Sequence, residues 1–310
     1  MHNFAILTDT ASDMTKQLRE RFGVEDYVHG ILVFPDGHAE PADLDWGNMT
    51  PAAYYGSMKD KKALYSSSLP SPQEYGDLFE KYLSQGRDVL FVCIASGLSG
   101  TYATGCTVAA ELREKYPERK IRCVDSLRYC GAEALLLTKA SELRAAGKSL
   151  DETADWLEAN RLRVHQMGVL EDLFFCKRMG RISGTAAVMG TLVGVRPMAD
   201  LGETGLSTPI GKVRGRKAAF QVCIEYIRRT IENPQEQIIF VTHSVREEQA
   251  LELKRRIEEE FHPREVIITT VCQACGASIG PGLYAAFYLG KPISKGLTEE
   301  RKLFAELTAK

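Results

Sequence analysis

Short apolar runs that alternate with long helical patterns limit the fold of this 310-residue chain more than any other feature. Residues 4–9, 89–95 and 120–125 each have the pattern of a buried strand. The helical patterns that follow these runs cover residues 12–22, 101–116 and 130–147. Because strands that are joined by helices pair side by side in parallel, the first half of the chain predicts parallel β-α-β units and an α/β fold.

The amino-acid composition of the chain changes after a further helical pattern at residues 150–163. Residues 165–215 are rich in glycine and short turns, and strand and helix patterns return after them. These later patterns are helices at 216–232 and 246–260, strands at 237–242 and 265–271, and a terminal helix from about 297. At about 150 residues per domain, the length also suggests two domains. We therefore predict α/β domains over residues 1–163 and 164–310.

One stretch of the second half carries no charge for 25 residues, from Val266 to Gly290. That length could cross a lipid bilayer as a helix. However, the stretch contains polar side chains such as Gln273, and the turn Gly280–Gly282 interrupts it. A membrane helix would not gain from that turn, whereas a strand, a loop and a short buried helix would need it. We therefore expect no stable membrane insertion.

The charge balance argues against nucleic acid as a partner. Lys and Arg number 39 against 41 Asp and Glu, so the formal net charge is −2. A dedicated nucleic-acid binder has a basic footprint, which this composition lacks. The first nine residues, Met1–Asp9, contain neither the basic region nor the long apolar core of a signal peptide. We therefore expect a cytoplasmic protein.

The eight cysteines are scattered along the chain, and several lie in apolar surroundings. In a cytoplasmic protein such cysteines are typical small core residues. Cys272 and Cys275 form a C-x-x-C motif, but no second Cys/His pair follows at the spacing of a zinc site. A thioredoxin-like motif would open a helix, whereas a glycine-rich turn follows here. We predict neither a metal site nor a cofactor.

The strand-to-helix turn Ser96–Thr101 is the strongest local signal of a binding site. It follows the apolar run 89–95, and the carboxyl end of a parallel strand is the usual ligand crevice of an α/β sheet. The backbone N–H groups of the following helix favour an anion. Capping of that helix by Ser99 explains the same residues without a ligand. The turn alone leaves both interpretations open.

Three further segments carry groups that could bind an anion: Ser66–Pro72, the turn Gly280–Gly282 after Ser278, and the basic segment Lys177–Ser183. Taken singly, each is more typical of a helix cap, a structural turn or a solvated loop. Their combination with the Ser96–Thr101 turn makes a binding function more attractive than any one of them does.

Several catalytic motifs are absent from the sequence. Gly147–Ser149 resembles the end of a phosphate-binding loop, but Glu142 stands where that motif needs glycine. Thr101 stands where a nucleophile elbow around Ser99 needs its last glycine. The six histidines are far apart, and His243, at a strand end, is more typical of a structural histidine. We therefore predict no catalytic residue.

Six short motifs occur in one order along nearly the whole chain. They are Thr8–Asp13 (similar to T-D-S-x-x-D), Ser67–Pro72 (T-S-Q-P-S-P), Ala95–Tyr102 (S-S-G-L-S-G-T-Y), Gly180–Ile182 (G-R-I), Lys212–Lys217 (a basic K-x-R segment) and Gly280–Gly282 (the end of T-H-T-G-P-G). Each motif is weak alone, but six in order are specific. Together they resemble the DegV family of bacterial fatty-acid-binding proteins.

The resemblance implies two α/β domains, the first a three-layer domain with a parallel sheet and the second a two-layer domain with a mixed sheet. It implies a long-chain fatty acid in an apolar pocket to which the second domain contributes, with the carboxylate held by hydroxyl groups at the domain interface. In this family a separate dihydroxyacetone-kinase-like fatty acid kinase phosphorylates the bound acyl group. The resemblance therefore implies a lipid carrier that is not an enzyme and has no cofactor besides its fatty acid ligand.

Carried over position by position, the resemblance predicts contacts to the fatty acid carboxylate. The residues are Ser67, Ser96, Ser278 and Gly280, with Ser67 and Ser96 as the first choices for donors. Arg181 and Arg214 match basic positions that would contact the head group or the kinase.

The chain departs from the family motifs at two places. Ser278 stands where the family usually has histidine, and Ser67 and Leu69 replace threonine and glutamine. A serine can donate a hydrogen bond but cannot carry a proton as histidine does. The departure bears on the handling of an acyl phosphate more than on fatty acid binding.

Two other functions fit the same motifs. One is an enzyme that transfers a phosphoryl group to a small anionic ligand or hydrolyses it at the hydroxyl-rich site, by analogy with the related dihydroxyacetone-kinase fold. The other is a lipid-responsive regulator whose partner is a protein.

Overall fold

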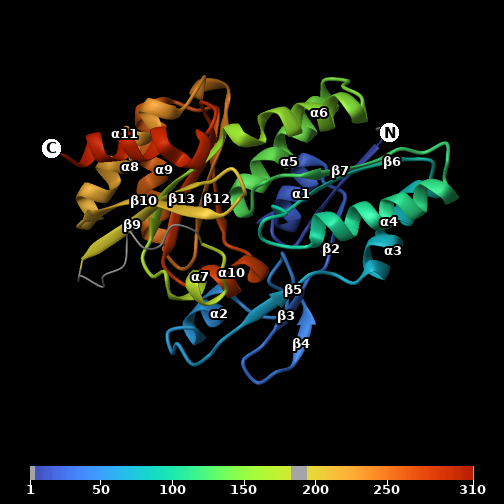
Figure 1. The fold of residues 1–310 in the computed structure, drawn as a ribbon, viewed down its shortest axis with the longest axis horizontal. Coiled ribbons are helices and arrows are strands. Elements are labelled where there is room, and N and C mark those ends of the chain that lie inside the picture. The colour runs from blue at the N-terminus through green and yellow to red at the C-terminus, as the bar shows by residue number, and fades with distance from the viewer. Residues whose placement is uncertain (1–3, 183–193, 310) are drawn as a thin grey trace.

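Three β-sheets and the helices around them make up the structure, a computed structural model that describes residues 4–182 and 194–309. A four-stranded sheet lies on the right in Figure 1, a six-stranded sheet on the left and a three-stranded sheet at the bottom. The predicted α/β class is confirmed, with a parallel sheet in the first half of the chain and a mixed sheet in the second. The small third sheet was not predicted.

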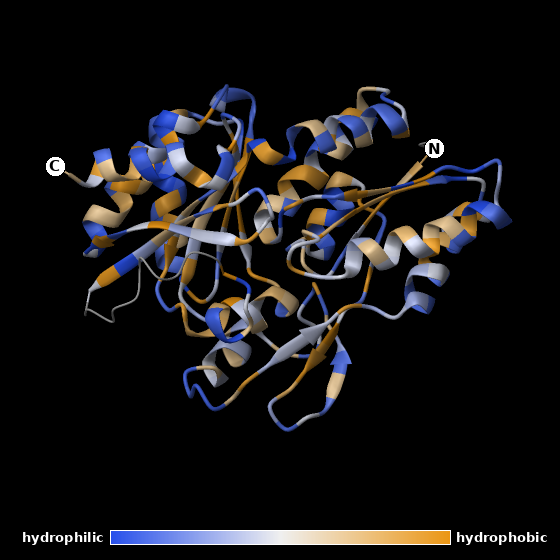
Figure 2. Ribbon diagram, in the orientation of Figure 1, coloured by the Kyte–Doolittle hydropathy of each residue, from blue (hydrophilic) through white to orange (hydrophobic). Residues whose placement is uncertain are grey.

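The four-stranded sheet has the order β2-β1-β6-β7, and all its pairs are parallel. Its strands are β1 (Phe4–Asp9), β2 (Asp26–Val28), β6 (Asp88–Cys93) and β7 (Ile121–Asp125). Every residue of β1 is buried, as in strands that are covered on both faces. Figure 2 shows the hydrophobic colour along these strands.

Helices cover both faces of this sheet, which gives the three predicted layers. α3 (Pro72–Leu83) and α4 (Thr101–Lys115) pack on one face, and α5 (Cys130–Ala145) and α6 (Leu150–Asn160) pack on the other. α1 (Lys16–Phe22) packs beside α5. The helix that the sequence predicted from Ser12 begins four residues later, because Asp13 has a left-handed φ of 52°. A residue in that conformation cannot continue a right-handed helix.

The six-stranded sheet has the order β10-β9-β8-β13-β11-β12, and only the β11–β12 pair is parallel. Its strands are β8 (Val164–Leu170), β9 (Val195–Leu201), β10 (Ser207–Arg214), β11 (Ile238–His243), β12 (Glu265–Thr270) and β13 (Leu283–Leu289). The outer face is covered by α8 (Arg216–Thr230), α9 (Glu247–Phe261) and α11 (Thr298–Thr308). Because β8 starts this sheet, the predicted boundary after residue 163 falls just before it; the division into domains stays a prediction.

Helix α5 lies between the two large sheets and contacts β1 and β6 of one and β8, β11 and β13 of the other. Every residue from Cys130 to Thr138 is buried. The helix approaches the six-stranded sheet closely at Gly131, where a Cβ atom would lie 2.5 Å from Thr242 Oγ1. One hydrophobic core therefore continues from the first sheet through α5 into the second, and includes Leu90, Leu135 and Phe287.

The small sheet is antiparallel and pairs β3 (Ile31–Val33) with β4 (Ala39–Pro41) and β5 (Ser66–Ser68). Its strands have three residues each, and β5 consists of serines. Neither their length nor an apolar pattern could therefore predict these strands from the sequence. The sheet matters because β5 and β3 lie against α10 (Gln273–Ile279).

Five shorter elements complete the described structure. They are the helices α2 (Pro51–Ser57) and α7 (Phe174–Arg178) and the 3₁₀ turns Arg161–Arg163, Pro234–Glu236 and Lys295–Leu297. α7 packs against α10.

The uncharged run from Val266 to Gly290 forms most of β12, all of α10 and all of β13. All but six of its residues are buried, which explains why charges are missing. Among the described residues, no helix combines the length and the apolar character that crossing a membrane would require.

Candidate functional site

A cavity of about 310 Å³ opens where the carboxyl ends of β1 and β6 meet the small sheet and α10. This volume lies at the lower end of the range for small-molecule sites in proteins. The lining residues are Asp9, Thr10, Ala11, Gly30, Ser67, Ser68, Leu69, Pro70, Ile94, Leu98, Ser99, Gly100, Thr101, Tyr129, Leu170, Cys176, Met179, Arg181, Ser207, Ala274, Cys275, Ser278, Ile279 and Leu283. They come from both halves of the chain.

The lining combines hydroxyl groups with apolar side chains. The hydroxyls belong to Thr10, Ser67, Ser68, Ser99, Thr101, Tyr129, Ser207 and Ser278. Aliphatic and sulfur-containing side chains, such as Leu170, Cys176, Met179 and Leu283, form most of the rest. Among the described lining residues, Asp9 is the only acid and Arg181 the only base. Such a cavity suits a ligand with a long apolar part and one small polar group.

Two of the predicted carboxylate contacts, Ser67 and Ser278, line the cavity. The Ser67 hydroxyl donates a hydrogen bond of 3.1 Å to the Ala274 carbonyl oxygen, which ties β5 to α10. Ser278 projects from α10 and is half-buried, and its hydroxyl makes no hydrogen bond with the described residues. Ser278 therefore has the more available hydroxyl group.

The third predicted contact, Ser96, lies outside the cavity lining. Its side chain is exposed, and its backbone N–H donates to Asp125 Oδ1 over 3.1 Å. The neighbouring Gly97 packs against the β9–β10 turn, where a Cβ atom would lie 2.3 Å from the Thr204 carbonyl oxygen. This end of the turn is used for packing between the two halves of the chain.

The other end of the same turn does line the cavity, at Ser99 and Thr101. Their hydroxyl oxygens lie 2.9 Å apart, and Ser99 Oγ also accepts a hydrogen bond of 3.3 Å from the Thr101 N–H. Ser99 thus contacts the first residue of α4 and lines the cavity as well, but the N-cap of α4 is Gly100, so the interpretation of Ser99 as the helix cap is wrong. The sequence marked the turn but not these two residues as the site.

Gly280, the fourth predicted contact, is also outside the lining. It has a φ of 72°, and a Cβ atom there would lie 2.1 Å from Phe175 Cδ2. The glycine therefore lets the turn after α10 pass against α7, whose residue Cys176 lines the cavity. This geometry explains the glycine by packing, and a ligand contact at Gly280 stays a prediction.

The two predicted basic residues lie in different places. Arg181 lines the cavity, is exposed, and donates a hydrogen bond of 2.7 Å to the Met179 carbonyl oxygen. Arg214 is exposed at the end of β10, away from the lining. Ser183, the last residue of the predicted basic segment, lies outside the described residues.

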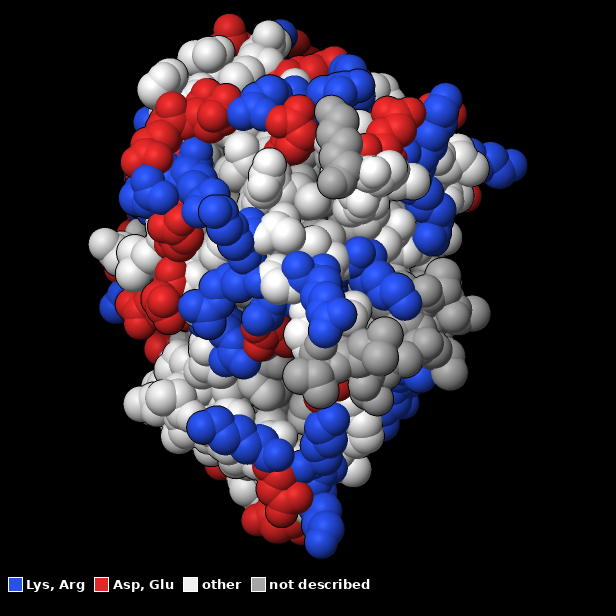
Figure 3. Space-filling model, turned by 90° about the vertical axis from the view of Figure 1, so that its left-hand side faces the viewer, with Lys and Arg blue, Asp and Glu red and all other residues white. Residues whose placement is uncertain are grey.

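Arg214 belongs to a basic face of the molecule. β10 and α8 lie on the left in Figure 1, and Figure 3, which turns that side to the viewer, shows Lys and Arg side chains gathered across its middle. The exposed basic residues of β10 and the start of α8 are Lys212, Arg214, Arg216 and Lys217.

Asp9 lines the cavity, and the sequence analysis singled it out only as part of the Thr8–Asp13 motif. Its two carboxylate oxygens accept hydrogen bonds from the Ala11 N–H (2.7 Å) and the Ile94 N–H (2.9 Å). Burial raises the pKa of Asp9 to about 6, because it disfavours the charged form more than the two N–H groups favour it. The carboxyl group can therefore change its charge near neutral pH.

Gln166 connects the cavity to a buried polar network in the six-stranded sheet. The hydroxyl of Tyr129 donates to Gln166 Oε1 over 2.9 Å, and Gln166 Nε2 donates to Ser207 Oγ over 3.2 Å. Both Tyr129 and Ser207 line the cavity. The backbone N–H of Gln166 donates to Asp200 Oδ1 over 2.7 Å.

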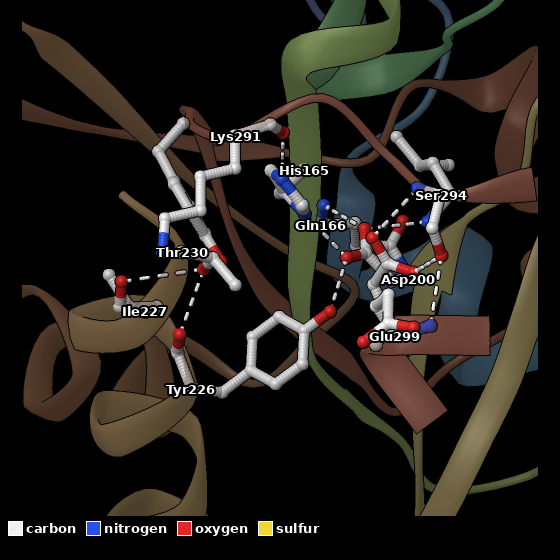
Figure 4. A network of polar contacts seen from close by, with 12 residues as sticks. His165, Gln166, Asp200, Tyr226, Ile227, Thr230, Lys291, Ser294 and Glu299 are labelled. Carbon is white, nitrogen blue, oxygen red and sulfur yellow. Dashed lines mark hydrogen bonds and ion pairs between the residues drawn. The ribbon is translucent and has the colours of Figure 1, made fainter. Parts of the chain in front are cut away.

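Asp200 is the centre of that network, as Figure 4 shows. Its oxygens also accept from His165 Nδ1 (2.6 Å), the Leu201 N–H (2.7 Å) and the Tyr226 hydroxyl (2.8 Å). Burial acts to raise the pKa of Asp200, but the charge and hydrogen bonds of His165 and the other donors outweigh it and lower that pKa. For His165 burial acts to lower the pKa, and contact with Asp200 and the Lys291 carbonyl raises it overall.

Three cysteines form a buried cluster beside the cavity. The Sγ atoms of Cys130, Cys272 and Cys275 all lie within 4.8 Å of one another. Cys272 directly precedes α10 and Cys275 lies in its first turn, so the expectation that no helix follows the C-x-x-C motif is wrong. The third cysteine begins α5, far away in the sequence, and spacing alone could not identify it.

The comparisons with known proteins agree with this architecture. A family model described as "Uncharacterised protein, DegV family" matches residues 3–291. The chain belongs to the DegV family. It is 32% identical over 290 residues to a DegV domain-containing protein of Clostridium perfringens, an alignment that covers 94% of this chain and 98% of the relative. The resemblance that the motifs predicted is confirmed.

Solved structures of DegV-family proteins share the fold. A protein from Thermus thermophilus, described by its fatty acid binding, is 25% identical with a TM-score of 0.82; the match covers 93% of this chain and 99% of that one. A stearic acid-binding protein from Eubacterium ventriosum is 22% identical with a TM-score of 0.79, covering 93% and 98%. A protein from Ruminococcus gnavus, described with vaccenic acid, is 20% identical with a TM-score of 0.82, covering 93% and 100%.

Proposed function

We propose that this DegV-family protein binds one long-chain fatty acid in the cavity at the end of the parallel sheet. The observation that carries the proposal is the lining itself, in which hydroxyl groups from six separate segments, one acid and one base surround a mostly apolar space. Burial of an acyl chain contributes about 0.8 kcal/mol per CH₂ group, so affinity does not require a charged clamp. The DegV proteins that are described with stearic and vaccenic acid support this ligand class.

The fatty acid carboxylate needs hydrogen-bond donors, because an unpaired buried charge is very costly. Within the lining, the Ser278 hydroxyl and the Arg181 guanidinium are the donors that we favour. Ser67 would have to give up its hydrogen bond to the Ala274 carbonyl oxygen to take part. Ser96 would have to turn towards the ligand from outside the lining.

We further propose that the protein presents this carboxylate to a separate kinase, which forms the acyl phosphate. Arg181 is exposed as well as part of the lining, so a carboxylate beside it would be accessible from outside. The exposed basic residues Lys212, Arg214, Arg216 and Lys217 offer a surface for an acidic partner. Arg214 would then contact the kinase and not the ligand.

The carrier proposal predicts fatty acid in protein purified from bacteria, and one molecule per chain on titration after delipidation. Native mass spectrometry measures both. A delipidated chain that is folded and takes up no hexadecanoic or octadecenoic acid would contradict the proposal. Formation of acyl phosphate, trapped with hydroxylamine, tests presentation separately by adding ATP and a dihydroxyacetone-kinase-like fatty acid kinase to the loaded protein.

Two alanine variants locate the carboxylate. Ser278→Ala should weaken fatty acid affinity about 10-fold or more, because a hydrogen bond to a charged group contributes about 1.5–3 kcal/mol. Ser96→Ala is the matched comparison, since its hydroxyl lies outside the lining, and we expect less than a twofold change. Titration calorimetry measures both. The reverse order would place the carboxylate at the Ser96 end of the turn.

A small-molecule enzyme at the same site has less support. Ser99 pairs with Thr101 and not with a general base, and no histidine is among the described residues that line the cavity. Hydroxyl groups without such a base are weak nucleophiles.

A further inference from the structure

The cluster of Cys130, Cys272 and Cys275 has the composition of a metal site. Its Sγ atoms lie within 4.8 Å of one another, and all three residues are buried. Thiolates bind Zn²⁺ at about 2.3 Å, which places the sulfur atoms of a tetrahedral site about 3.8 Å apart. The three sulfur atoms are therefore within about 1 Å of the separation that one ion requires.

Asp13 lies beside the cluster and is the candidate for a fourth ligand, although its carboxylate oxygens are not within 4.8 Å of all three sulfur atoms and would have to move closer on binding. Its carboxyl group interacts with the thiols of Cys272 and Cys130, and Oδ1 accepts a hydrogen bond of 2.8 Å from the Cys272 N–H. Its other oxygen, Oδ2, is buried and has no hydrogen-bond partner among the described residues. A buried acceptor without a donor is costly, and a cation would satisfy it.

The surroundings of the cluster contain further buried acids. Asp9 is 3% exposed, Asp13 2% and Glu133 0%, and Glu133 Oε2 also has no hydrogen-bond partner among the described residues. Within those residues, none of the three makes a salt bridge with lysine or arginine. Three thiols and three carboxyl groups in one uncompensated region favour a bound cation.

We propose that Cys130, Cys272 and Cys275, with the Asp13 carboxylate, bind one thiophilic divalent cation of the Zn²⁺ type beside the fatty acid cavity. Each thiol gives its proton to solvent as its sulfur binds the metal, so binding releases at least three protons per ion. The ion has a path to the site, because Cys275 lines the cavity. An acyl chain in the cavity would cover that path and slow exchange of the metal.

The test uses the full-length protein, reduced with a phosphine and freed of metal by a chelator. After dialysis against Zn²⁺, we expect one zinc per chain by atomic emission. Co²⁺ should give the thiolate charge-transfer bands in the near ultraviolet and the strong visible bands of a four-coordinate ion. Zn²⁺ should also raise the midpoint of thermal unfolding, because it binds the folded state.

Single alanine variants of the three cysteines should each lose the cobalt thiolate bands that belong to the site and bind Zn²⁺ at least 100-fold more weakly. Cys223→Ala is the matched control, because Cys223 is also buried but lies on α8, in the separate core between that helix and the six-stranded sheet. Asp13→Asn should retain zinc with about 10-fold weaker affinity, which separates loss of one ligand from loss of the fold. Uptake of fatty acid, measured on every variant, reports whether the cavity is intact.

Three results would overturn the proposal: no zinc uptake by the reduced wild-type protein, zinc that all three cysteine variants retain, or equal loss in Cys223→Ala. A disulfide between two of the cluster thiols that persists in the reduced protein would overturn it too, since it removes two ligands. The proposal stands or falls independently of fatty acid binding, which has its own measurement.

Discussion

Buried acids near the cavity differ in their hydrogen bonding: Asp200 is one case, and Asp13 and Glu133 are the other. Asp200 has 0% exposure, yet both of its oxygens accept hydrogen bonds, and one of them also faces His165. Asp13 and Glu133 are buried to the same degree, but each has one oxygen without a hydrogen-bond partner among the described residues. The pKa of Asp200 is lowered, whereas burial raises the pKa of Asp13 and of Glu133 well above the ordinary range.

Burial alone therefore does not decide the charge of an acid in this protein. The lowered pKa of Asp200 favours its charged form, because His165 and several other donors contact its oxygens, and these hydrogen bonds join β8, β9 and α8. Asp13 and Glu133 would have to be neutral, or receive a cation from outside, because each has a single hydrogen-bond donor and no salt bridge among the described residues. The hydrogen bonds of Asp200 are all made within the protein, whereas Asp13 and Glu133 each keep an oxygen that could bind a cation.

The largest expected change in stability comes from removing the charge of Asp200. Asp200→Asn removes the carboxylate that four donors share, among them His165 Nδ1, and we expect a loss of about 3–5 kcal/mol in the free energy of unfolding at pH 7. Glu133→Gln is the matched change at the other site; it should cost less than about 1 kcal/mol, because the raised pKa of Glu133 favours its neutral form, which an amide resembles. Urea denaturation measures both. Equal losses would mean that the two groups do not differ in charge.

A smaller change in stability is expected from Asp9 and depends on pH. Both oxygens of Asp9 accept hydrogen bonds, as in Asp200, but its pKa is raised, as in Asp13 and Glu133. Its pKa is raised to about 6 from 3.8, so the folded state keeps a proton that the unfolded state loses, and stability falls as pH rises through this window. Asp200, with a lowered pKa, contributes stability above its unfolded pKa that is lost as pH falls. Between pH 4 and 7, Asp9→Asn should gain roughly 2 kcal/mol relative to the wild type.

The measurement is urea denaturation of both proteins at several pH values. The difference between them is the readout, because all other titrating groups cancel in it. A difference that does not change with pH would mean that Asp9 titrates outside this range.

The smallest expected change in stability comes from the hydrogen bond between Tyr129 and Gln166, which connects the cavity to the Asp200 network. Tyr129→Phe removes the hydrogen bond to Gln166, and we expect a loss of about 1 kcal/mol in the free energy of unfolding. Tyr284→Phe is the control, because the Tyr284 hydroxyl is buried without a hydrogen-bond partner among the described residues. That variant should be neutral or slightly more stable. If both variants lose stability alike, the loss comes from packing and not from the network.

The sequence predicted several of the long, periodic elements but missed the long strands β8, β9, β10 and β13. β1, β6, α4 and α5 lie where the apolar runs and helical patterns placed them, because burial on both faces or on one stripe leaves a strong pattern. It did not predict β3, β4 and β5, whose three residues each are too short for any period. Ser67 belongs to one of these strands, so its motif was visible while the element that positions it was not.

Only part of the candidate site was predicted, because a motif identifies a segment of the chain but not which of its side chains point into the cavity. Ser67, Ser278 and Arg181 line the cavity, whereas Ser96 and Gly280 lie in the marked turns but outside the lining. Which side chain of a turn faces the cavity depends on the backbone path, which the sequence does not display. The cysteine cluster shows the same limit, since Cys130 joins Cys272 and Cys275 only through the packing of α5.

The position of α5 has a consequence for how the chain folds. A helix that is buried from Cys130 to Thr138 between two sheets has no face that could be left in water. A fragment that ends near residue 163 would carry α5 without the second sheet, and its exposed apolar surface would favour aggregation. The two halves should therefore unfold in one cooperative transition, and ligands should enter by local movement around α10 and not by a hinge between the sheets.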